Sequence, residues 1–289
     1  MFAWELDFLR LLEGARTDFL VRLFEAVTII GEELIIIFLV AITYFVFDKK
    51  LASRIFFITA TSLCVNNIIK NIAKVPRPFT KGISCERVDT ATGYAFPSGH
   101  TQSVATWSAA FAAKFKKPLL VLASLVLTVL VAFSRMFLGA HYPSDVIVGS
   151  VLGISLAFLL NYLYDKVKSV HSIHLIAVLA LFPFAVFFMF SAQELYADFY
   201  KVYGMLIGLL FGSLFEERFV GLGYDSPWYK KAVRVLVAVA AAFAVKEGLK
   251  AVLVTDIVQL ALVFDMLRYF ALVFVVLALG SLAFKKLKL

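Results

Sequence analysis

The chain has 289 residues, of which 62% are hydrophobic and only 17% are charged, and its mean hydropathy is +0.91. So few charges exclude a soluble globular domain and a disordered chain, and the composition therefore predicts a membrane protein. The net charge of +8 does not indicate a nucleic-acid partner, because no basic stripe with interleaved aromatic residues lies outside the apolar segments.

The first residues carry the acidic side chains Glu5 and Asp7 and lack a basic region followed by a small-residue cleavage site. We therefore expect no cleavable signal peptide. Residues 3–13 have the spacing of an amphipathic helix at the membrane interface. Cys64 lies in an apolar segment and Cys85 in a polar one, which predicts neither a disulfide nor a CxxC metal site.

Apolar runs long enough to cross a bilayer recur along the whole chain. They predict an all-α, polytopic membrane bundle. The expected segments are 17–30, 33–47, 51–72, 99–114, 118–137, 144–164, 171–191, 197–215, 230–252 and 262–284. The first two, separated by a break at Gly31, are short for complete spans.

Counting the loops alternately from one side to the other sorts the basic residues. One side receives 17 of the 28, beginning with Arg10 and Arg16. By the positive-inside rule this side is cytoplasmic, so both termini are expected there, with the protein in the plasma membrane. The opposite side then holds 74–97, 138–143, 192–196 and 253–261, of which the first is the only long polar loop.

Unusual polar chemistry gathers on that opposite side, and its first element is Lys70 with Arg77. Seven residues separate the two cations where a predicted helix ends and Pro76 and Pro78 stiffen the chain. The two side chains can therefore turn toward a common point. Taken alone, the pair would be explained by basic side chains reaching the membrane interface.

The second element, Pro97-Ser98-Gly99-His100, begins a predicted helix. Free backbone N–H groups at a helix N-terminus favour an anion, Gly99 permits close approach, and Ser98 adds a hydroxyl donor. His100 could give or take a proton near neutral pH. By itself the element fits an ordinary helix cap with a satisfied histidine equally well.

The third element runs from Ser134-Arg135 to His141 and Asp145. Arg135 offers a planar fork that suits phosphate oxygens. Asp145, four residues after His141, could orient the imidazole and stabilise its cation, so that the histidine acts as a nucleophile toward phosphorus. An aspartate beside a histidine within a membrane is costly without a role.

Together the elements place three cations, a helix N-terminus, a hydroxyl group, two histidines and a carboxylate on one predicted membrane face. This combination predicts a phosphoryl-transfer site. Zinc is the rival interpretation of two histidines and an aspartate, but three nearby cations repel a metal ion and attract a phosphate. We therefore expect neither a metal nor another cofactor.

These residues resemble the three-part signature of the type-2 phosphatidic acid phosphatase superfamily, the lipid phosphate phosphatases. The matching motifs are K-x6-RP at Lys70–Pro78, PSGH at Pro97–His100 and SR-x5-H-x3-D at Ser134–Asp145. The resemblance implies a six-helix phosphatase core over residues 1–170. Residues 171–289 add four predicted transmembrane helices without a matching motif.

The resemblance also implies a role for each site residue. His141 would attack phosphorus to form a phosphohistidine, Asp145 would orient it, and His100 would protonate the leaving oxygen. The residues that would hold the phosphoryl oxygens are Lys70, Arg77, Ser98, Gly99 and Arg135.

In residues 171–289 we expect interfacial charges rather than a second site. Two charge clusters lie near predicted helix ends, Glu216-Glu217-Arg218 and Lys246-Glu247 with Lys250, and His171 and His174 lie among lysines. The repeated small residues Gly204, Gly208 and Gly212 predict close helix packing, within the chain or between protomers of a homo-oligomer.

The expected function is an integral membrane phosphatase that hydrolyses a lipid phosphate or pyrophosphate at the outer, extracytoplasmic face. The motifs are expected to bind the phosphate group, so they do not distinguish between undecaprenyl pyrophosphate, phosphatidylglycerophosphate and phosphatidate as the substrate. A phosphotransferase with the same site is an alternative. A lipid-phosphate transporter is another, suggested by the number of helices and the break at Gly31, although transport requires no pair such as His141 and Asp145.

Overall fold

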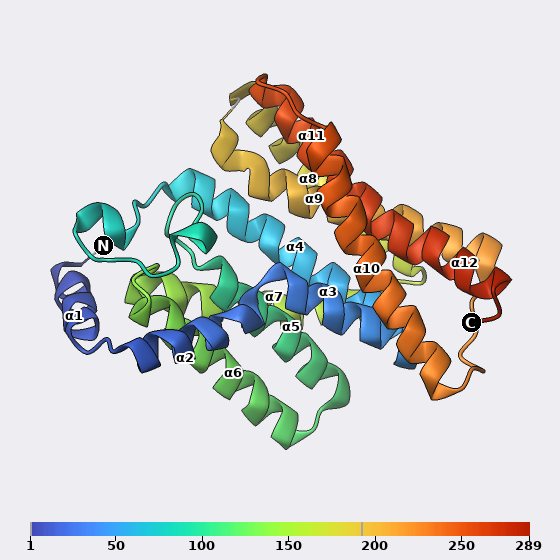
Figure 1. The fold of residues 1–289 in the computed structure, drawn as a ribbon, viewed down its shortest axis with the longest axis horizontal. Helices are drawn as coiled ribbons and strands as arrows, with labels where there is room; N and C mark the ends of the chain where they lie inside the picture. The colour runs from blue at the N-terminus through green and yellow to red at the C-terminus, as the bar shows by residue number, and fades with distance from the viewer. Residues whose placement is uncertain (1, 192) are drawn as a thin grey trace. The chain divides into compact units, whose positions relative to one another are not determined.

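The computed structural model describes residues 2–191 and 193–289, and the regular structure within them is helical (Figure 1), which confirms the all-α prediction. The α-helices are α1 (Ala3–Gly14), α2 (Asp18–Thr28), α3 (Glu33–Ile42), α4 (Lys49–Ala73), α5 (Gly99–Phe115), α6 (Pro118–Phe137), α7 (Pro143–Lys166), α8 (Val170–Ser191), α9 (Ala197–Phe215), α10 (Trp228–Val252), α11 (Val258–Phe274) and α12 (Ser281–Lys286). Shorter helical turns are η1 (Ile29–Gly31), η2 (Thr43–Phe47), η3 (Pro78–Lys81), η4 (Val88–Thr90), η5 (Glu194–Tyr196), η6 (Glu216–Val220) and η7 (Val275–Gly280).

Among the residues that the structure describes, six helical stretches are long and apolar enough to cross a membrane, so the chain is a multi-pass membrane protein. They are Lys49–Lys81, Pro118–Phe137, Pro143–Lys166, Val170–Ser191, Glu194–Val220 and Val258–Lys286. Two other predicted spans fall outside this set: α5 has only 17 residues, and α10 carries charged residues toward both ends.

The expected spans at 17–30 and 33–47 are not separate crossings. They pass the same test only together, as the pair Asp18–Gly31 and Ile35–Phe47, bent by 49°. The 11 residues of α2 rise only about 17 Å, too little for a hydrocarbon core of about 30 Å. Glu32 has an extended backbone that interrupts the helix at the break.

By its contacts the chain divides into two compact units. The first comprises Met1–Ile36 and Val65–Tyr162, and the second comprises Ile37–Cys64 and Leu163–Leu289. In the first unit α7 packs closely on α5 at Gly149. A Cβ at this position would lie only 2.8 Å from the Ser98 carbonyl oxygen, so a larger residue would not fit. This close contact joins the start of α5 to the start of α7.

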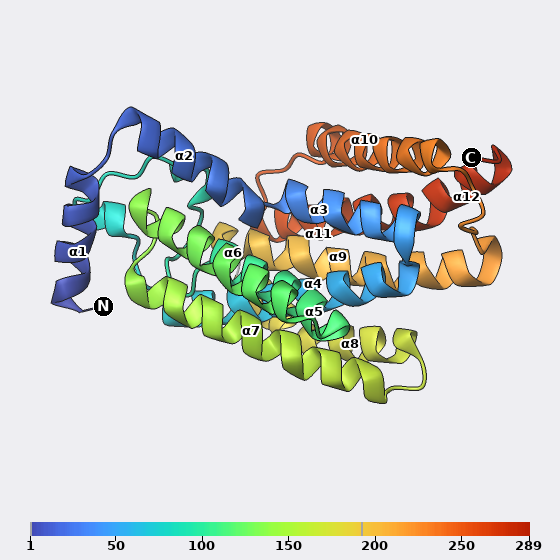
Figure 2. The same cartoon turned by 90° about the horizontal axis from the view of Figure 1, so that it is seen from below.

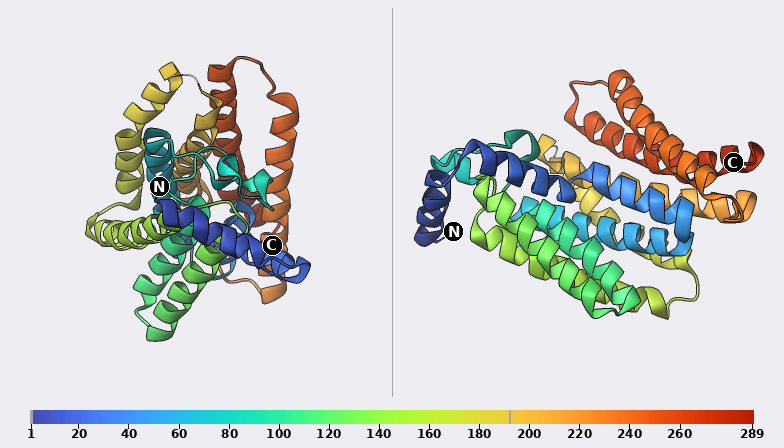
Figure 3. Two further views of the ribbon diagram at one scale, coloured as in Figure 1. Left: turned by 90° about the vertical axis from the view of Figure 1, so that its left-hand side faces the viewer. Right: turned by 60° about the horizontal axis from the view of Figure 1, so that its bottom comes forward.

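The position of α1 relative to the 74–97 loop differs from the prediction. This helix crosses the end of the first unit at which α6 finishes and α7 begins (Figures 2 and 3). Arg16 donates hydrogen bonds to the Ser84 and Phe137 carbonyl oxygens, so it lies beside the 74–97 loop. The expectation that Arg10 and Arg16 lie on the opposite side from this loop is wrong, because α1 packs against the loop and Arg16 is hydrogen-bonded to it.

In the second unit the spaced glycines pack α9 against α11. A Cβ on Gly204 would collide with the Met266 carbonyl oxygen, and one on Gly208 would lie 2.7 Å from the Phe270 carbonyl oxygen. A Cβ on Gly212 would meet Leu277 at 3.1 Å. The predicted close packing is therefore made within the chain.

The interfacial assignment fails for two residues of the second unit. The His174 side chain is buried, with its ring centroid 4.9 Å from that of Phe57 and 6.0 Å from that of Tyr164. Glu216 is also buried and accepts hydrogen bonds from Lys49 Nζ at 2.6 Å and from the Leu222 N–H at 2.8 Å. Aromatic rings and an ion pair brought together by the fold make both positions interior.

Candidate active site

Arg77 is held by the backbone of two loops. After α4 the chain turns at Lys74, where φ is 51°, and passes into η3. The buried Arg77 guanidinium donates to three carbonyl oxygens, those of Thr92, Gly93 and Ala140, at 2.5, 3.2 and 3.0 Å. These bonds fix the guanidinium where the 74–97 loop meets the loop between α6 and α7.

The predicted pair of His141 and Asp145 is formed at the start of α7, and each side chain is 1% exposed. Nδ1 of His141 lies 3.2 Å from Oδ2 of Asp145. The same Oδ2 accepts from the Tyr142 N–H at 2.8 Å, as a residue in the first turn of a helix commonly does for the residue before the helix. Asp145 is thereby fixed independently of the histidine that it orients.

The other imidazole nitrogen, Nε2 of His141, lies 2.8 Å from Nη1 of Arg77. A guanidinium is only a donor, so Nε2 accepts and the imidazole proton lies on Nδ1, facing Asp145. This tautomer leaves the lone pair of Nε2 on the side of the cations.

Ser98 and His100 join the site from the start of α5. The Ser98 N–H donates to the Asp145 carbonyl oxygen at 3.0 Å, which ties α5 to the pair. The Ser98 hydroxyl lies 3.0 Å from that of Thr101, and Gly99 begins the helix. Nε2 of His100 is buried and has no hydrogen-bond partner within the described residues.

Gly31 contributes the space that His100 occupies. A Cβ on Gly31 would lie 3.0 Å from the Cβ of His100. The break between α2 and α3 therefore lies against the site, and a larger residue there would displace the histidine.

Arg135 is fully buried at the end of α6. Its Nη1 donates to the hydroxyl groups of Thr28 and Thr90, at 3.2 and 3.1 Å. Its Nε and Nη2 have no hydrogen-bond partner within the described residues. Buried guanidinium donors without a partner are costly, and an anion would satisfy them.

Burial and the surrounding positive charge keep His141 neutral. Burial lowers the pKa of its imidazole well below the usual range, and the cations Arg77, Arg135 and Lys70 lower it further. Lys70 lies in the last turn of α4. A neutral imidazole among cations is suited to react with an anionic electrophile.

Sequence reasoning missed several neighbours of these residues. Thr28 and Thr90 hold Arg135, and neither belongs to a recognised motif. Arg87 lies near enough to Arg135 and His100 to affect them electrostatically, and it bonds Glu32 at 2.9 Å and Asp89 at 3.0 Å. Of these neighbours, only Arg87 could have been suspected from the sequence, because it is an arginine in the long polar loop beside a basic motif.

All three predicted motifs thus meet in the first unit. Ser98 and Asp145 are joined directly, as are Arg77 and His141. Within residues 2–191 and 193–289, no three His, Cys, Asp or Glu side chains form a group that could hold a metal ion.

Comparisons with known families identify two regions. Residues 51–169 match the family described as the PAP2 superfamily. Residues 200–289 match the family described as a PAP2 superfamily phosphatase, transmembrane extension. The first match includes all eight predicted site residues.

Curated relatives match over shorter stretches. Phosphatidylglycerophosphatase B of Haemophilus influenzae is 41% identical over 81 residues, which cover 25% of this chain and 32% of the relative. Phosphatidylglycerophosphatase B of Bacillus subtilis is 30% identical over 118 residues, 37% of this chain and 55% of the relative. An undecaprenyl-diphosphatase of Sulfolobus acidocaldarius is 38% identical over 68 residues, 24% of this chain and 32% of the relative.

The chain therefore spans between about a third and about half of the length of these relatives. Among solved structures, the transmembrane PAP2 type phosphatidylglycerolphosphate phosphatase from Bacillus subtilis is similar, with a TM-score of 0.48 and 22% identity. The similarity covers 58% of this chain and 88% of that one.

Proposed function

We propose that this chain, which carries a PAP2 superfamily domain and the transmembrane extension of that superfamily, is a phosphatase that hydrolyses a lipid phosphate or pyrophosphate. The observation that carries the proposal is the alignment of Arg77, His141 and Asp145. It leaves a neutral, oriented imidazole whose lone pair faces cations. The names of the relatives support the substrate class, since all three act on phosphorylated lipids.

The phosphoryl group is held by donors that already converge on the site. Arg135 supplies two buried donors that have no partner among the described residues, and Arg77 supplies a guanidinium beside the nucleophile. Ser98, Gly99 and Lys70 complete the cradle with a hydroxyl group, a helix N-terminus and a charge. Such prearranged donors stabilise negative charge as it develops in the transition state.

In the first step Nε2 of His141 attacks phosphorus. A P–N bond forms while the P–O bond to the lipid, or to the terminal lipid phosphate of a pyrophosphate, breaks. The bonding electron pair leaves with the oxygen, which takes a proton from Nε2 of His100. Burial and the nearby cations lower the pKa of His100 in the free protein, and the bound phosphate anion offsets those cations and allows its imidazole to be protonated. The imidazole becomes a cation, and Asp145 stabilises it through Nδ1.

In the second step water hydrolyses the phosphohistidine. His100, now neutral, accepts a proton from the water as its oxygen attacks phosphorus. The P–N bond breaks, its electron pair returns to Nε2 of His141, and inorganic phosphate leaves. Both histidines end in their starting protonation states.

We propose that the reaction uses no metal ion and takes place at the extracytoplasmic face. Three cations next to the nucleophile already supply the charge stabilisation that a metal would provide. EDTA should therefore leave activity unchanged. Inactivation by EDTA that is reversed by Mg²⁺ or Zn²⁺ would contradict this part of the proposal.

Phosphate release from a lipid panel in detergent tests the function. The purified chain is incubated with phosphatidate, phosphatidylglycerophosphate and undecaprenyl pyrophosphate at equal detergent concentration, with His141→Ala as the blank. We expect free inorganic phosphate from at least one lipid and none with the variant. Phosphate that appears only on an added acceptor would indicate a phosphotransferase, and no turnover of any lipid would refute the proposal.

A further inference from the structure

The N-terminal helix α1 is attached to the segment that carries His141 and Asp145. The buried carboxylate of Glu5 accepts a hydrogen bond from the Ser144 N–H at 2.9 Å and one from the Phe2 N–H at 2.7 Å. Ser144 directly precedes Asp145. The attachment therefore reaches to within one residue of the carboxylate that orients the nucleophile.

Glu5 satisfies a donor that α7 leaves open. The helix begins at Pro143, so the Ser144 N–H lies in its first turn, where no carbonyl group of the same helix can accept. A serine, threonine or aspartate before a helix normally supplies this acceptor, but Tyr142 occupies that position. The Glu5 carboxylate takes its place from another helix.

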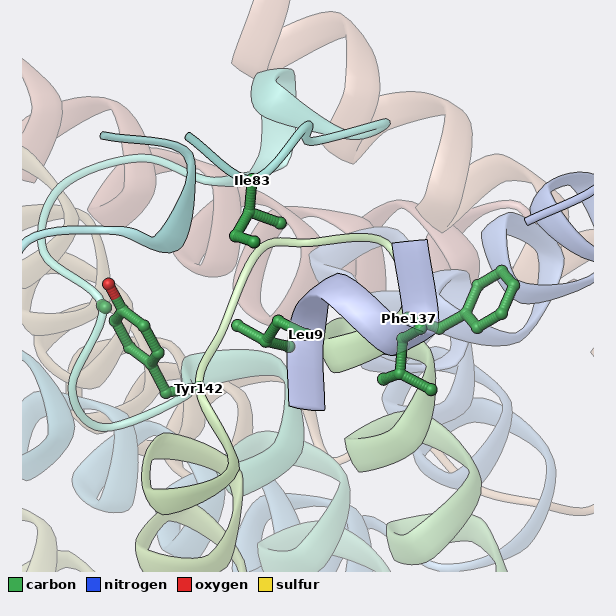
Figure 4. Close-up of a cluster of buried hydrophobic side chains, with 6 residues drawn as sticks. Leu9, Ile83, Phe137 and Tyr142 are labelled. Atoms are coloured by element: carbon green, nitrogen blue, oxygen red, sulfur yellow. The ribbon is translucent and has the colours of Figure 1, made fainter. Parts of the chain in front are cut away.

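An apolar cluster holds α1 against the same loops. Leu9 lies at its centre, with Ile83, Phe137 and Tyr142 around it (Figure 4). Leu9 and Tyr142 are both fully buried. Tyr142 adjoins His141, so packing from α1 bears on the backbone next to the nucleophile.

The far end of α1 makes a second set of polar contacts. The Ser84 N–H donates to Glu13 at 2.8 Å, and Arg16 donates to the Phe137 carbonyl oxygen at 2.8 Å. Gly139, with φ of 76°, lets the loop pass beside Ser84, whose carbonyl oxygen a Cβ would overlap. The loop that carries His141 is thus held at one end by Glu5 of α1 and at the other by Arg16, two residues beyond the end of that helix.

We propose that α1 is a clamp that positions the nucleophile, with Glu5 as its positioning residue, acting through Ser144 on Asp145 and through Asp145 on His141. The inference rests on the proposed phosphatase function. Without the clamp the first turn of α7 loses an acceptor, and the pair of His141 and Asp145 loses its register with Arg77. Small misplacements of a nucleophile cost rate without weakening substrate binding.

The charge of Glu5 gives the proposal a second consequence. Burial alone would raise the pKa of the Glu5 carboxyl, but hydrogen bonds from Phe2 and Ser144 outweigh it and hold the pKa below the usual value. Glu5 is therefore an anion near the orienting aspartate. The groups that face His141 are Arg77 and Lys70 from α4 and the loop after it, His100 from α5, Arg135 from α6 and Asp145 from α7.

The test compares Glu5→Ala and Glu5→Gln with Asp7→Asn, a loss of the same charge from an exposed position on the same helix. Activity is measured on the lipid that the wild-type protein hydrolyses. We expect kcat to fall at least tenfold for Glu5→Ala and less for Glu5→Gln, which keeps one acceptor, with KM within twofold of wild type. Asp7→Asn should match wild type.

The pH profile separates positioning from folding. Loss of the Glu5 charge favours the neutral imidazole, so the acidic limb of kcat/KM should move to lower pH in Glu5→Gln. Leu9→Ala loosens the same clamp without a charge change, so it should lower kcat and leave the limb in place. If Glu5→Ala does not fold, the comparison of Glu5→Gln with Leu9→Ala still tests the proposal.

Wild-type kcat in both Glu5→Ala and Leu9→Ala, or an unmoved limb in Glu5→Gln, would overturn the inference while leaving the phosphatase function intact. Absence of turnover by the wild-type chain on every lipid would instead refute the proposed function. The two failures are therefore distinguishable.

Discussion

Nη1 of Arg77 lies 2.8 Å from Nε2 of His141, the nitrogen to which the proposed reaction assigns the attack on phosphorus. This hydrogen bond fixes the reactive tautomer, since the guanidinium can only donate. It must also be broken before Nε2 can form a bond to phosphorus. A phosphate that takes the N–H groups of Arg77 frees the lone pair, so substrate binding and activation of the nucleophile are coupled through one guanidinium.

Replacement of the two histidines should separate their roles. His141→Ala removes the nucleophile, so turnover should fall at least about 10³-fold and no phosphoenzyme should form. His100→Ala removes only the proton donor and acceptor, and a radiolabelled phosphohistidine should survive an alkaline quench of the reaction. His171→Ala is the matched control, because His171 lies outside the proposed site. Labelled protein in the His141 variant would contradict the assignment of the nucleophile.

The acidic limb of the pH profile should report the charges around His141. Burial, together with Arg77 and Arg135, holds the pKa of His141 well below the usual value for histidine, so the free enzyme keeps a neutral nucleophile through mildly acidic pH. Arg135→Gln removes one positive charge and should raise this pKa. The acidic limb of kcat/KM should then move to higher pH than in the wild-type protein. Both proteins are measured on the same substrate, so ionisation of the substrate affects both profiles equally. An unchanged limb would show that this charge does not act on His141.

Gly139 should tolerate no side chain. Its φ of 76° is unfavourable for other residues, and a Cβ would overlap the Ser84 carbonyl oxygen. Gly139→Ala should lower the free energy of unfolding by about 2 kcal/mol or more and reduce activity, since His141 lies two residues away. Gly248→Ala is the control, because a Cβ at Gly248 meets nothing within 4 Å and alanine favours the helix. Thermal unfolding in detergent measures both, and equal stability of the two variants would contradict the geometry.

The side on which α1 lies can be read by cysteine labelling. In a chain with Cys64→Ala and Cys85→Ala, single cysteines are placed at Arg10, in α1, and Lys81, in the long loop. A third cysteine at Lys116 marks the opposite end of α5. An impermeant maleimide added to intact cells should label the cysteines at Arg10 and Lys81 together and that at Lys116 only after lysis. If the cysteine at Arg10 instead reacts only after lysis, as that at Lys116 does, α1 lies on the side that the distribution of basic residues predicts.

Much of the site could be predicted from sequence because its motifs are local. The partners Lys70 and Arg77 lie within eight positions, and His141 and Asp145 lie one helical turn apart, so the chemistry is visible at short range. The contacts of Arg135 with Thr28 and Thr90 join segments 107 and 45 residues away, and threonine alone carries no signal of this kind.

Hydropathy by itself determined that this chain is helical and crosses a membrane, because transfer of apolar residues into lipid depends on composition over about 20 residues. Spacing by itself determined which side chains carry the predicted phosphate chemistry. Tertiary structure decided the rest: that α2 and α3 meet at a bend of 49°, that α1 lies beside the site, that His174 is interior, and that Glu5 accepts a hydrogen bond from the first turn of α7. These features depend on packing and hydrogen bonding between distant segments, whose free energies no local pattern records.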